Sequence, residues 1–273
     1  PSIAVLPFDN LSDDKEDEFF SDGIHDEILM QISKISELNV ISRSSVIRYK
    51  ETDKSIPEIG KELGVSAILE GSIRRFGNRV RVTAQLIDAK TDYHIWSDTY
   101  DREMKDIFEI QSDIARNIAD TLRVELTSAE REYLEAKPTD NLEAYDFYLL
   151  GRDYGGRGGD ENRRIAIQMF QKAIDLDPEF ALAYARLSRV HIRLYWNYYD
   201  RTPERLAKSK EAADKALELN PDLPEAHVAL GRYYYDGYLD DDRALEQFAI
   251  ARKSQPNNTE LLAAIGYVQR SQG

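Results

Sequence analysis

The chain has 273 residues, enough for about two domains, and it carries a formal net charge of −14 at pH 7. Because phosphate contacts need concentrated Lys and Arg, this acidic balance argues against nucleic-acid binding as the main task. The absence of cysteine excludes disulfides, thiol catalysis and thiolate metal sites, and no apolar run approaches the roughly 20 residues of a membrane span, so we expect no membrane insertion.

The first half of the chain begins with a short buried strand. Residues Ser2–Phe8 are mostly apolar, and an acidic loop, Asp9–Glu18, follows them. We expect a helix capped by Ser21 or Asp22, because isoleucines recur downstream at helical spacing. Residues Leu38–Arg43 predict a second strand.

The next elements carry clearer local signals. Ser55 and Glu58 form a capping box, which predicts a short helix that ends at Gly64. Residues 65–75 and 79–88 alternate on both sides of Gly77-Asn78, as in a β-hairpin. A strand is expected over 93–100, followed by a long helix capped by Asp106 and Glu109. These elements predict an α/β domain with a mixed sheet over residues 1–126.

A connector is expected over residues 127–141. Two capping-box patterns, Thr127/Glu130 and Asp140/Glu143, together with Pro138, predict breaks in helical continuity rather than a disordered linker. We therefore expect two separate domains joined by a helical segment.

Residues 142–273 contain an internal repeat. Three similar helix ends stop at Pro178, Pro221 and Pro256. The helical segment upstream of each of these ends carries a small residue at the equivalent position of the repeat, and one further segment does the same. These residues are Gly151, Ser188, Gly231 and Gly266, and they lie 37, 43 and 35 positions apart. This spacing is close to the roughly 34-residue period of helix-turn-helix repeats and predicts an all-α solenoid of three repeats plus the first helix of a fourth. Because such an array normally ends in a polar cap, we expect the chain to belong to a longer protein.

The second half resembles tetratricopeptide (TPR) repeats, with insertions expected around 155–160 and 195–203. The first half resembles the TolB-like amino-terminal domain. The residues that carry this resemblance are Ile3–Ser12, Ser21–Ile24, Val40–Ser45, Ile59–Val65, Leu69–Arg75, Arg81–Asp88 and Trp96–Arg102. That domain occurs upstream of TPR repeats in bacterial adenylate cyclase-type and winged-helix regulatory proteins, and the resemblance implies a regulatory, non-catalytic module.

One candidate ligand or docking site lies in the α/β domain, where polar residues fall at strand ends and in loops. Its members are Arg43, Ser44, Ser45, Glu70, Ser72, Arg74, Asp101 and Arg102. The alternative is a self-satisfied network in which Glu70 and Asp101 pair with Arg43, Arg74 or Arg102.

A candidate peptide-binding groove lies in the repeats. Arg152, Arg189 and Arg232 share one repeat phase, and Arg193 and Arg270 follow about one turn later. A column of guanidinium groups suits an acidic or C-terminal peptide, which it would bind through charge-assisted, often bidentate hydrogen bonds. Tyr148 and Tyr235 complete the predicted groove. The alternative is that the arginines pair with carboxylates of neighbouring repeats.

The sequence indicates no catalytic residues, metal site or cofactor. The four histidines are scattered without zinc-ligand spacing, and the acidic loop lacks the pattern of a calcium loop. No nucleophile elbow or phosphate loop is present, so we expect no enzymatic activity from these residues, although the full-length protein could carry an adenylate cyclase domain.

We therefore expect a ligand- or protein-binding scaffold of a multidomain bacterial signalling protein, either adenylate cyclase-associated or a transcriptional regulator. Its expected partner is a protein or an acidic or C-terminal peptide, and the sequence also allows self-association. The alternatives are a cell-envelope structural protein and, less favoured, a hydrolase that uses Asp and Glu. The sequence leaves the compartment open.

Overall fold

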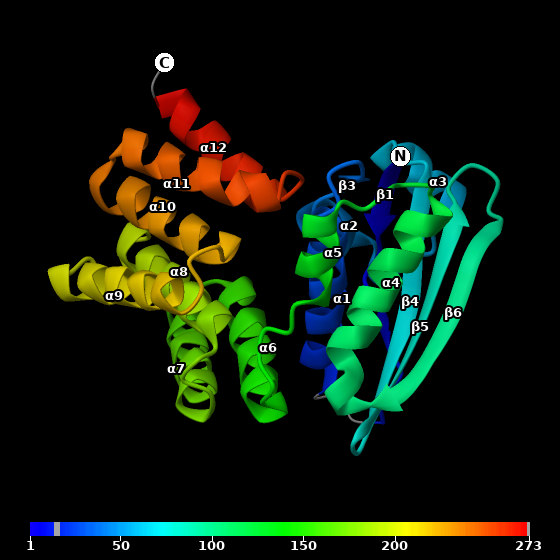
Figure 1. Ribbon diagram of the computed structural model, residues 1–273, viewed down its shortest axis with the longest axis horizontal. Helices are drawn as coiled ribbons and strands as arrows, with labels where there is room; N and C mark the ends of the chain where they lie inside the picture. Colours follow the sequence, from blue (N-terminus) through cyan, green and yellow to red (C-terminus); the bar gives the residue numbers. More distant parts are fainter. Residues whose placement is uncertain (14–16, 272–273) are drawn as a thin grey trace. The chain divides into compact units, whose positions relative to one another are not determined.

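The computed structural model describes residues 1–13 and 17–271, so part of the predicted acidic loop and the terminal Gly273 lie outside the described residues. The described chain divides into two compact units (Figure 1). One comprises Pro1–Lys137 with Gln255–Thr259, and the other comprises Pro138–Ser254 with Glu260–Gly273. The predicted boundaries after residues 126 and 141 stay predictions.

The first unit is built on a mixed sheet in the order β3-β1-β4-β5-β6, with β2 also paired to β4. Strands β1, β2 and β3 run parallel to their neighbours, whereas β4, β5 and β6 form an antiparallel meander. The tight turn at Gly77, whose φ is +57°, closes the predicted hairpin. The strand bounds are β1 Ser2–Val5, β2 Asp9–Asn10, β3 Asn39–Val40, β4 Ala67–Phe76, β5 Arg79–Asp88 and β6 His94–Glu103.

Helices cover the two faces of this sheet unequally. The long helices α1 (Glu18–Ser33) and α4 (Ile107–Thr121) pack on the face that carries Ile73, Val82 and Tyr100. The opposite face is covered near β1 by an apolar cluster drawn from α2 (Arg43–Val46), η2 (Ile47–Tyr49) and α3 (Ile56–Leu63). Farther along β4, β5 and β6 the register places mostly polar side chains on that opposite face, among them Ser72, Thr83 and Thr99, although Phe76 at the end of β4 also lies there.

Two predicted boundaries in this unit are wrong. Helix α1 already begins at Glu18, after Asp17, so Ser21 and Asp22 lie inside it and cap nothing. The strand expected over 38–43 is reduced to β3, because the chain turns into helix α2 at Arg43. The capping box of Ser55 and Glu58 is confirmed at the start of α3, which ends at Gly64 in the left-handed region.

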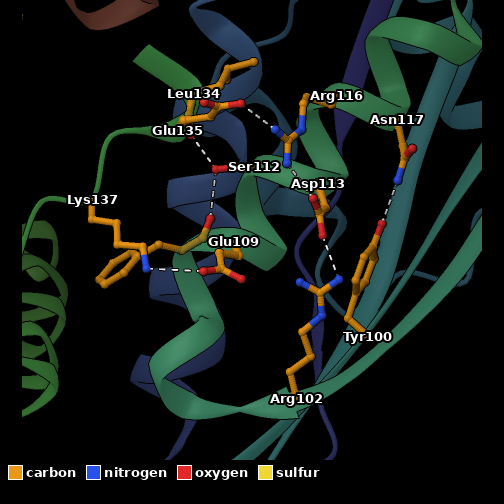
Figure 2. A network of polar contacts seen from close by, with 11 residues as sticks. Tyr100, Arg102, Glu109, Ser112, Asp113, Arg116, Asn117, Leu134, Glu135 and Lys137 are labelled. Carbon is orange, nitrogen blue, oxygen red and sulfur yellow. Dashed lines mark hydrogen bonds and ion pairs between the residues drawn. The ribbon is translucent and has the colours of Figure 1, made fainter. Parts of the chain in front are cut away.

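Helix α5 (Ser128–Glu135) is tied to α4 by a polar network (Figure 2). The Ser112 hydroxyl donates to the Leu134 carbonyl, and Arg116 forms ion pairs with both Asp113 and Glu135 at 2.7 Å. Asp113 also accepts a hydrogen bond from Arg102 of β6 at 2.8 Å. The segment that the sequence predicts as a connector therefore packs, through α5, on the first unit.

The second unit consists of helices that pair in sequence order: α6 with α7, α8 with α9, and α10 with α11. The three helices that end each pair stop just before Pro178, Pro221 and Pro256, as predicted. Together with the mixed sheet of the first unit, these pairs confirm the fold class, an α/β amino-terminal domain and a TPR-like all-α solenoid. The bounds are α6 Leu142–Arg157, α7 Asp160–Leu176, α8 Ala181–Trp196, α9 Pro203–Leu219, α10 Pro224–Tyr238, α11 Asp241–Ser254 and α12 Thr259–Ser271.

Small residues allow the paired helices to approach closely. A Cβ atom added at Gly151 would lie 2.8 Å from the Phe170 ring, and one at Gly231 would lie 2.4 Å from the Phe248 ring. In the second repeat the equivalent contact is polar, because Ser188 donates to the Ser209 carbonyl at 2.7 Å and the Ser209 hydroxyl donates back at 3.0 Å. The repeat position that is phenylalanine in the other two repeats is Ala213 in the second repeat. The smaller side chain leaves room for these hydroxyls.

Two details of the repeats differ from the predictions. Asn141, not Asp140, caps α6, since its side-chain oxygen accepts from the Ala144 amide at 3.1 Å. Gly155 and Gly156 are helical, so the insertion expected around 155–160 reduces to Gly158 and Gly159, both with positive φ. Over residues 1–13 and 17–271, we find no helix with the length and hydropathy required to span a bilayer.

Candidate functional site

An arginine-lined cavity of about 280 Å³ lies among the helices of the second unit. Arg163 reaches it from α7, Arg189 and Arg193 from α8, and Arg232 from α10. The remaining lining residues are Ile192, Trp196, Asn197 and Asp236. Four cations and one anion therefore surround a space smaller than most ligand pockets. We call it the arginine cavity.

Glu260, at the start of α12, supplies a second carboxylate to this cluster. Both terminal nitrogens of Arg189 donate to it, and its Oε1 also accepts from Arg193 at 3.2 Å. Although desolvation disfavours its charged form, Arg189, Arg186 and Arg193 hold the pKa of Glu260 well below its usual range. Glu260 is therefore a carboxylate held bidentately by one guanidinium, the geometry that Arg favours.

The other arginines are less completely neutralised. Arg232 lies 3.7 Å from Asp236, which is an ion-pair distance but too long for a hydrogen bond. Repulsion from Arg189, together with desolvation, lowers the pKa of Arg193 to about 10. Burial also raises the pKa of Asp236, despite the arginines nearby. The cluster thus keeps a surplus of positive charge in partly buried surroundings.

The structure brings together three of the five arginines that the sequence predicts for the groove, namely Arg189, Arg193 and Arg232. Arg152 lies instead over the Tyr148 ring, and Arg270 lies over the Tyr267 ring on α12. Neither Arg152 nor Arg270 lines the arginine cavity, so the place of these two in the predicted groove stays a prediction.

The two predicted tyrosines also separate. Tyr148 is fully buried against Phe170 and Phe180, so its assignment to a peptide-binding surface is wrong. Tyr235 is only partly buried and stacks on Trp196, which lines the cavity, with ring centroids 6.2 Å apart. Tyr235 therefore supports the wall of the cavity.

Sequence reasoning missed Arg163, Asp236 and Glu260. The repeat phase compares equivalent first helices, whereas Arg163 belongs to the second helix of its pair. Glu260 lies 71 residues after Arg189, and no local pattern links them. Asp236 follows Arg232 at i+4, a spacing that could have marked it as a partner.

The eight residues of the predicted α/β-domain site do not form one site. Arg43 pairs with Asp26 of α1, Arg74 with Asp13, and Arg102 with Asp113 of α4. Asp101 accepts from Arg79 and Arg81 instead, and as the neighbour of Arg102 on β6 it faces the other side of the sheet.

The remaining members have separate surroundings. The Ser42 hydroxyl shares hydrogen bonds with the hydroxyls of Ser44 and Ser45. Glu70 and Ser72 lie along the open face of β4, where desolvation raises the pKa of Glu70. The alternative network is also incorrect in its partners, because no ion pair within residues 1–13 and 17–271 joins Glu70 or Asp101 to Arg43, Arg74 or Arg102.

Among the residues that the structure describes, no three His, Asp or Glu side chains gather in a way that could hold a metal ion. Buried His191 is instead a packing residue whose Nδ1 accepts from Arg205 at 2.7 Å. Desolvation, together with Arg205, lowers the pKa of His191 to about 3, so the ring is neutral.

Comparison with known proteins finds one similar family and one similar curated protein. Residues 1–117 match the second domain of HilA/YgeH-like transcriptional regulators. Over 235 residues the chain is 39% identical to the Rhizobium meliloti (strain 1021) protein named "Putative adenylate cyclase 3". That alignment covers 84% of this chain and 39% of the relative, so the chain spans well under half of that relative's length.

Solved structures show weaker similarity. TolB from Acinetobacter baumannii aligns with 45% of this chain and 28% of its own, at 15% identity and a TM-score of 0.35. The first TPR domain of Spaghetti, solved with an HSP90 peptide, aligns with 48% of this chain and 96% of its own, at 17% identity and a TM-score of 0.39. The regulator and cyclase matches, with the observed fold, confirm the resemblance to a TolB-like amino-terminal domain followed by TPR repeats.

Proposed function

We propose that this chain is a non-catalytic binding and scaffold module of a multidomain bacterial signalling protein. Its helical repeats would hold an acidic or C-terminal peptide at the arginine cavity. The observation that carries this proposal is the convergence of four arginines from three helices in a chain whose net charge is −14. Such local positive charge is needed before an acidic partner can approach an acidic protein.

Glu260 supports a carboxylate as the preferred chemistry. Arg189 already binds this carboxylate from within the chain, whereas Arg193 gives it one 3.2 Å hydrogen bond and Arg232 lies beside Asp236 without hydrogen-bond distance. We therefore assign the partner's carboxylates to Arg193 and Arg232, with Arg189 and Glu260 fixing the geometry of α8. The likeness to a transcriptional regulator and a cyclase suggests that the activity of the whole protein resides in a further domain.

The test uses a fluorescent peptide, Gly-Glu-Glu-Gly-Glu, with a free terminal carboxylate, and measures its anisotropy as the chain is added. Replacing Arg232 with alanine should weaken binding about tenfold to a hundredfold, because one charge-assisted hydrogen bond contributes about 1.5–3 kcal/mol. Arg252→Ala, at an exposed position of α11 outside the cavity, is the matched control and should bind like the native chain. An absence of binding, or equal loss in both variants, would contradict the proposal.

A further inference from the structure

The arginine cavity holds more positive charge than a single added carboxylate could neutralise. Four arginines line it, and Arg186 also lies 4.0 Å from Glu260, whereas the carboxylates of Glu260, Asp236 and Glu225 act on Arg189. Positive charge is therefore in excess. Since repulsion from Arg189, together with desolvation, already lowers the pKa of Arg193 to about 10, an added anion would relieve part of an existing electrostatic cost.

The arginines with remaining capacity stand on different helices. Arg163 comes from α7, Arg193 from α8 and Arg232 from α10, so their guanidinium groups approach the cavity from separate backbone positions. A carboxylate offers two oxygens in one plane and a single charge. A phosphoryl group offers three oxygens on a tetrahedral centre and a charge of about −1.5 to −2 at pH 7, which matches both the number of donors and the surplus charge.

The size of the cavity limits what can carry that group. A volume of about 280 Å³ equals roughly nine water molecules at about 30 Å³ each, enough for one anionic head group and a short stem. It falls just below the range of about 300–1,000 Å³ that encloses complete small ligands. Ile192 and the partly exposed Trp196 supply apolar wall beside the arginines, suited to the stem of a side chain.

We propose that the arginine cavity binds the phosphoryl group of a phosphorylated serine or threonine in the partner peptide. This inference rests on the proposed function, and it names the residue of the peptide that enters the cavity. Arg163, Arg193 and Arg232 donate to the phosphoryl oxygens, while Glu260 keeps Arg189 in place.

Three peptides of the same length test this inference: Gly-Ser-Glu-Ser-Gly with its second serine phosphorylated, the same peptide with glutamate there, and the unmodified peptide. Titration calorimetry with the whole chain should give at least tenfold tighter binding for the phosphopeptide than for the glutamate peptide. Arg232→Lys keeps the charge but loses the guanidinium fork, and we expect it to lower phosphopeptide affinity at least fivefold. Arg252→Lys on α11 is the control and should leave affinity unchanged.

The outcomes separate the two levels of the proposal. Equal affinity for the phosphopeptide and the glutamate peptide would overturn the phosphoryl inference and leave the acidic-peptide function standing. Binding of none of the peptides would overturn both. Inorganic phosphate that binds as tightly as the phosphopeptide would show a site for a small phosphorylated compound and would also overturn the inference. Circular dichroism of each variant confirms that the helices are intact.

Discussion

The two units of this chain place their arginines in different surroundings. On the open face of the sheet, Asp101 pairs with Arg79 and Arg81, whose side chains are about half exposed. In the repeats, the side chain of Arg189 is only 10% exposed, and Arg189 shares Glu260 with Arg193. Because water screens exposed pairs far more than buried ones, the same residue types make a weak surface network in one unit and a charged cavity in the other.

Close helix packing, which the repeats require, should show the largest response to a single change. In Gly231→Ala the added methyl group would lie 2.4 Å from the Phe248 ring, so we expect a loss of about 2–3 kcal/mol in the free energy of unfolding of the helical unit. Gly266→Ala is the matched control, because nothing lies within 4 Å of its added Cβ atom. Helix propensity should make that control neutral or stabilising by up to about 1 kcal/mol. Urea unfolding followed by circular dichroism measures the free energy of unfolding of both variants. Equal changes would show that the contact between Gly231 and the Phe248 ring is not tight.

Removing one charge from each unit sharpens the comparison directly. Glu260→Gln leaves buried Arg189 without its counter-charge, and we expect a loss of about 2 kcal/mol, below the usual cost for a buried pair because Glu260 is 45% exposed. Asp101→Asn removes the shared carboxylate of an exposed network and should cost less than about 1 kcal/mol. Both values come from urea unfolding at pH 7. A larger loss for Asp101→Asn would reverse the comparison.

A pH dependence from His191 is the most gradual of the expected effects. Its folded-state pKa of about 3 lies below the ordinary value of 6.5, so between these pH values the unfolded chain binds a proton that the folded chain does not. Stability of the helical unit should therefore fall on acidification below about pH 6.5, by at most about 1.4 kcal/mol per pH unit. Lys208 and Arg205 near the ring add to this effect, whereas Asp200 opposes it.

Replacing His191 with Asn removes the titrating ring. Urea unfolding at pH 7, 6 and 5 should then show a shallower loss than in the native chain, since ordinary carboxylates titrate mostly below this range. The same slope in both proteins would mean that the ring is protonated without cost.

Local sequence signals predicted local structure well in both units. The capping boxes at Ser55 and Thr127 were confirmed because a cap depends only on residues within one helical turn. Asp140 was a wrong choice of cap because its neighbour Asn141 offers the same chemistry one residue later. The register of the hairpin followed from Gly77-Asn78, since a two-residue turn fixes which residues are paired.

The candidate sites show what local sequence signals do not predict, namely the burial of a side chain and the residues that it contacts. Repeat phase grouped Arg189 with Arg232, and both line one cavity because equivalent positions of stacked helices face the same way. It could not show that Tyr148 is buried, because the burial of an aromatic residue on a first helix depends on what the next repeat packs against it. For the α/β domain, proximity to strand ends did not predict a site, because neighbouring strand residues such as Asp101 and Arg102 face opposite sides of the sheet.

By itself, the sequence determined the period of the repeats, the helix ends at proline, the small residues at helix contacts and the β-hairpin around Gly77-Asn78, since each depends on the local geometry of the backbone. Tertiary structure decided which charges meet. Arg163 reaches the cavity from a second helix and Glu260 from a helix 71 residues beyond Arg189, and only the packing of α7, α8, α10 and α12 brings them together. Electrostatic energy depends on distance and burial in three dimensions, and neither can be read from spacing along the chain.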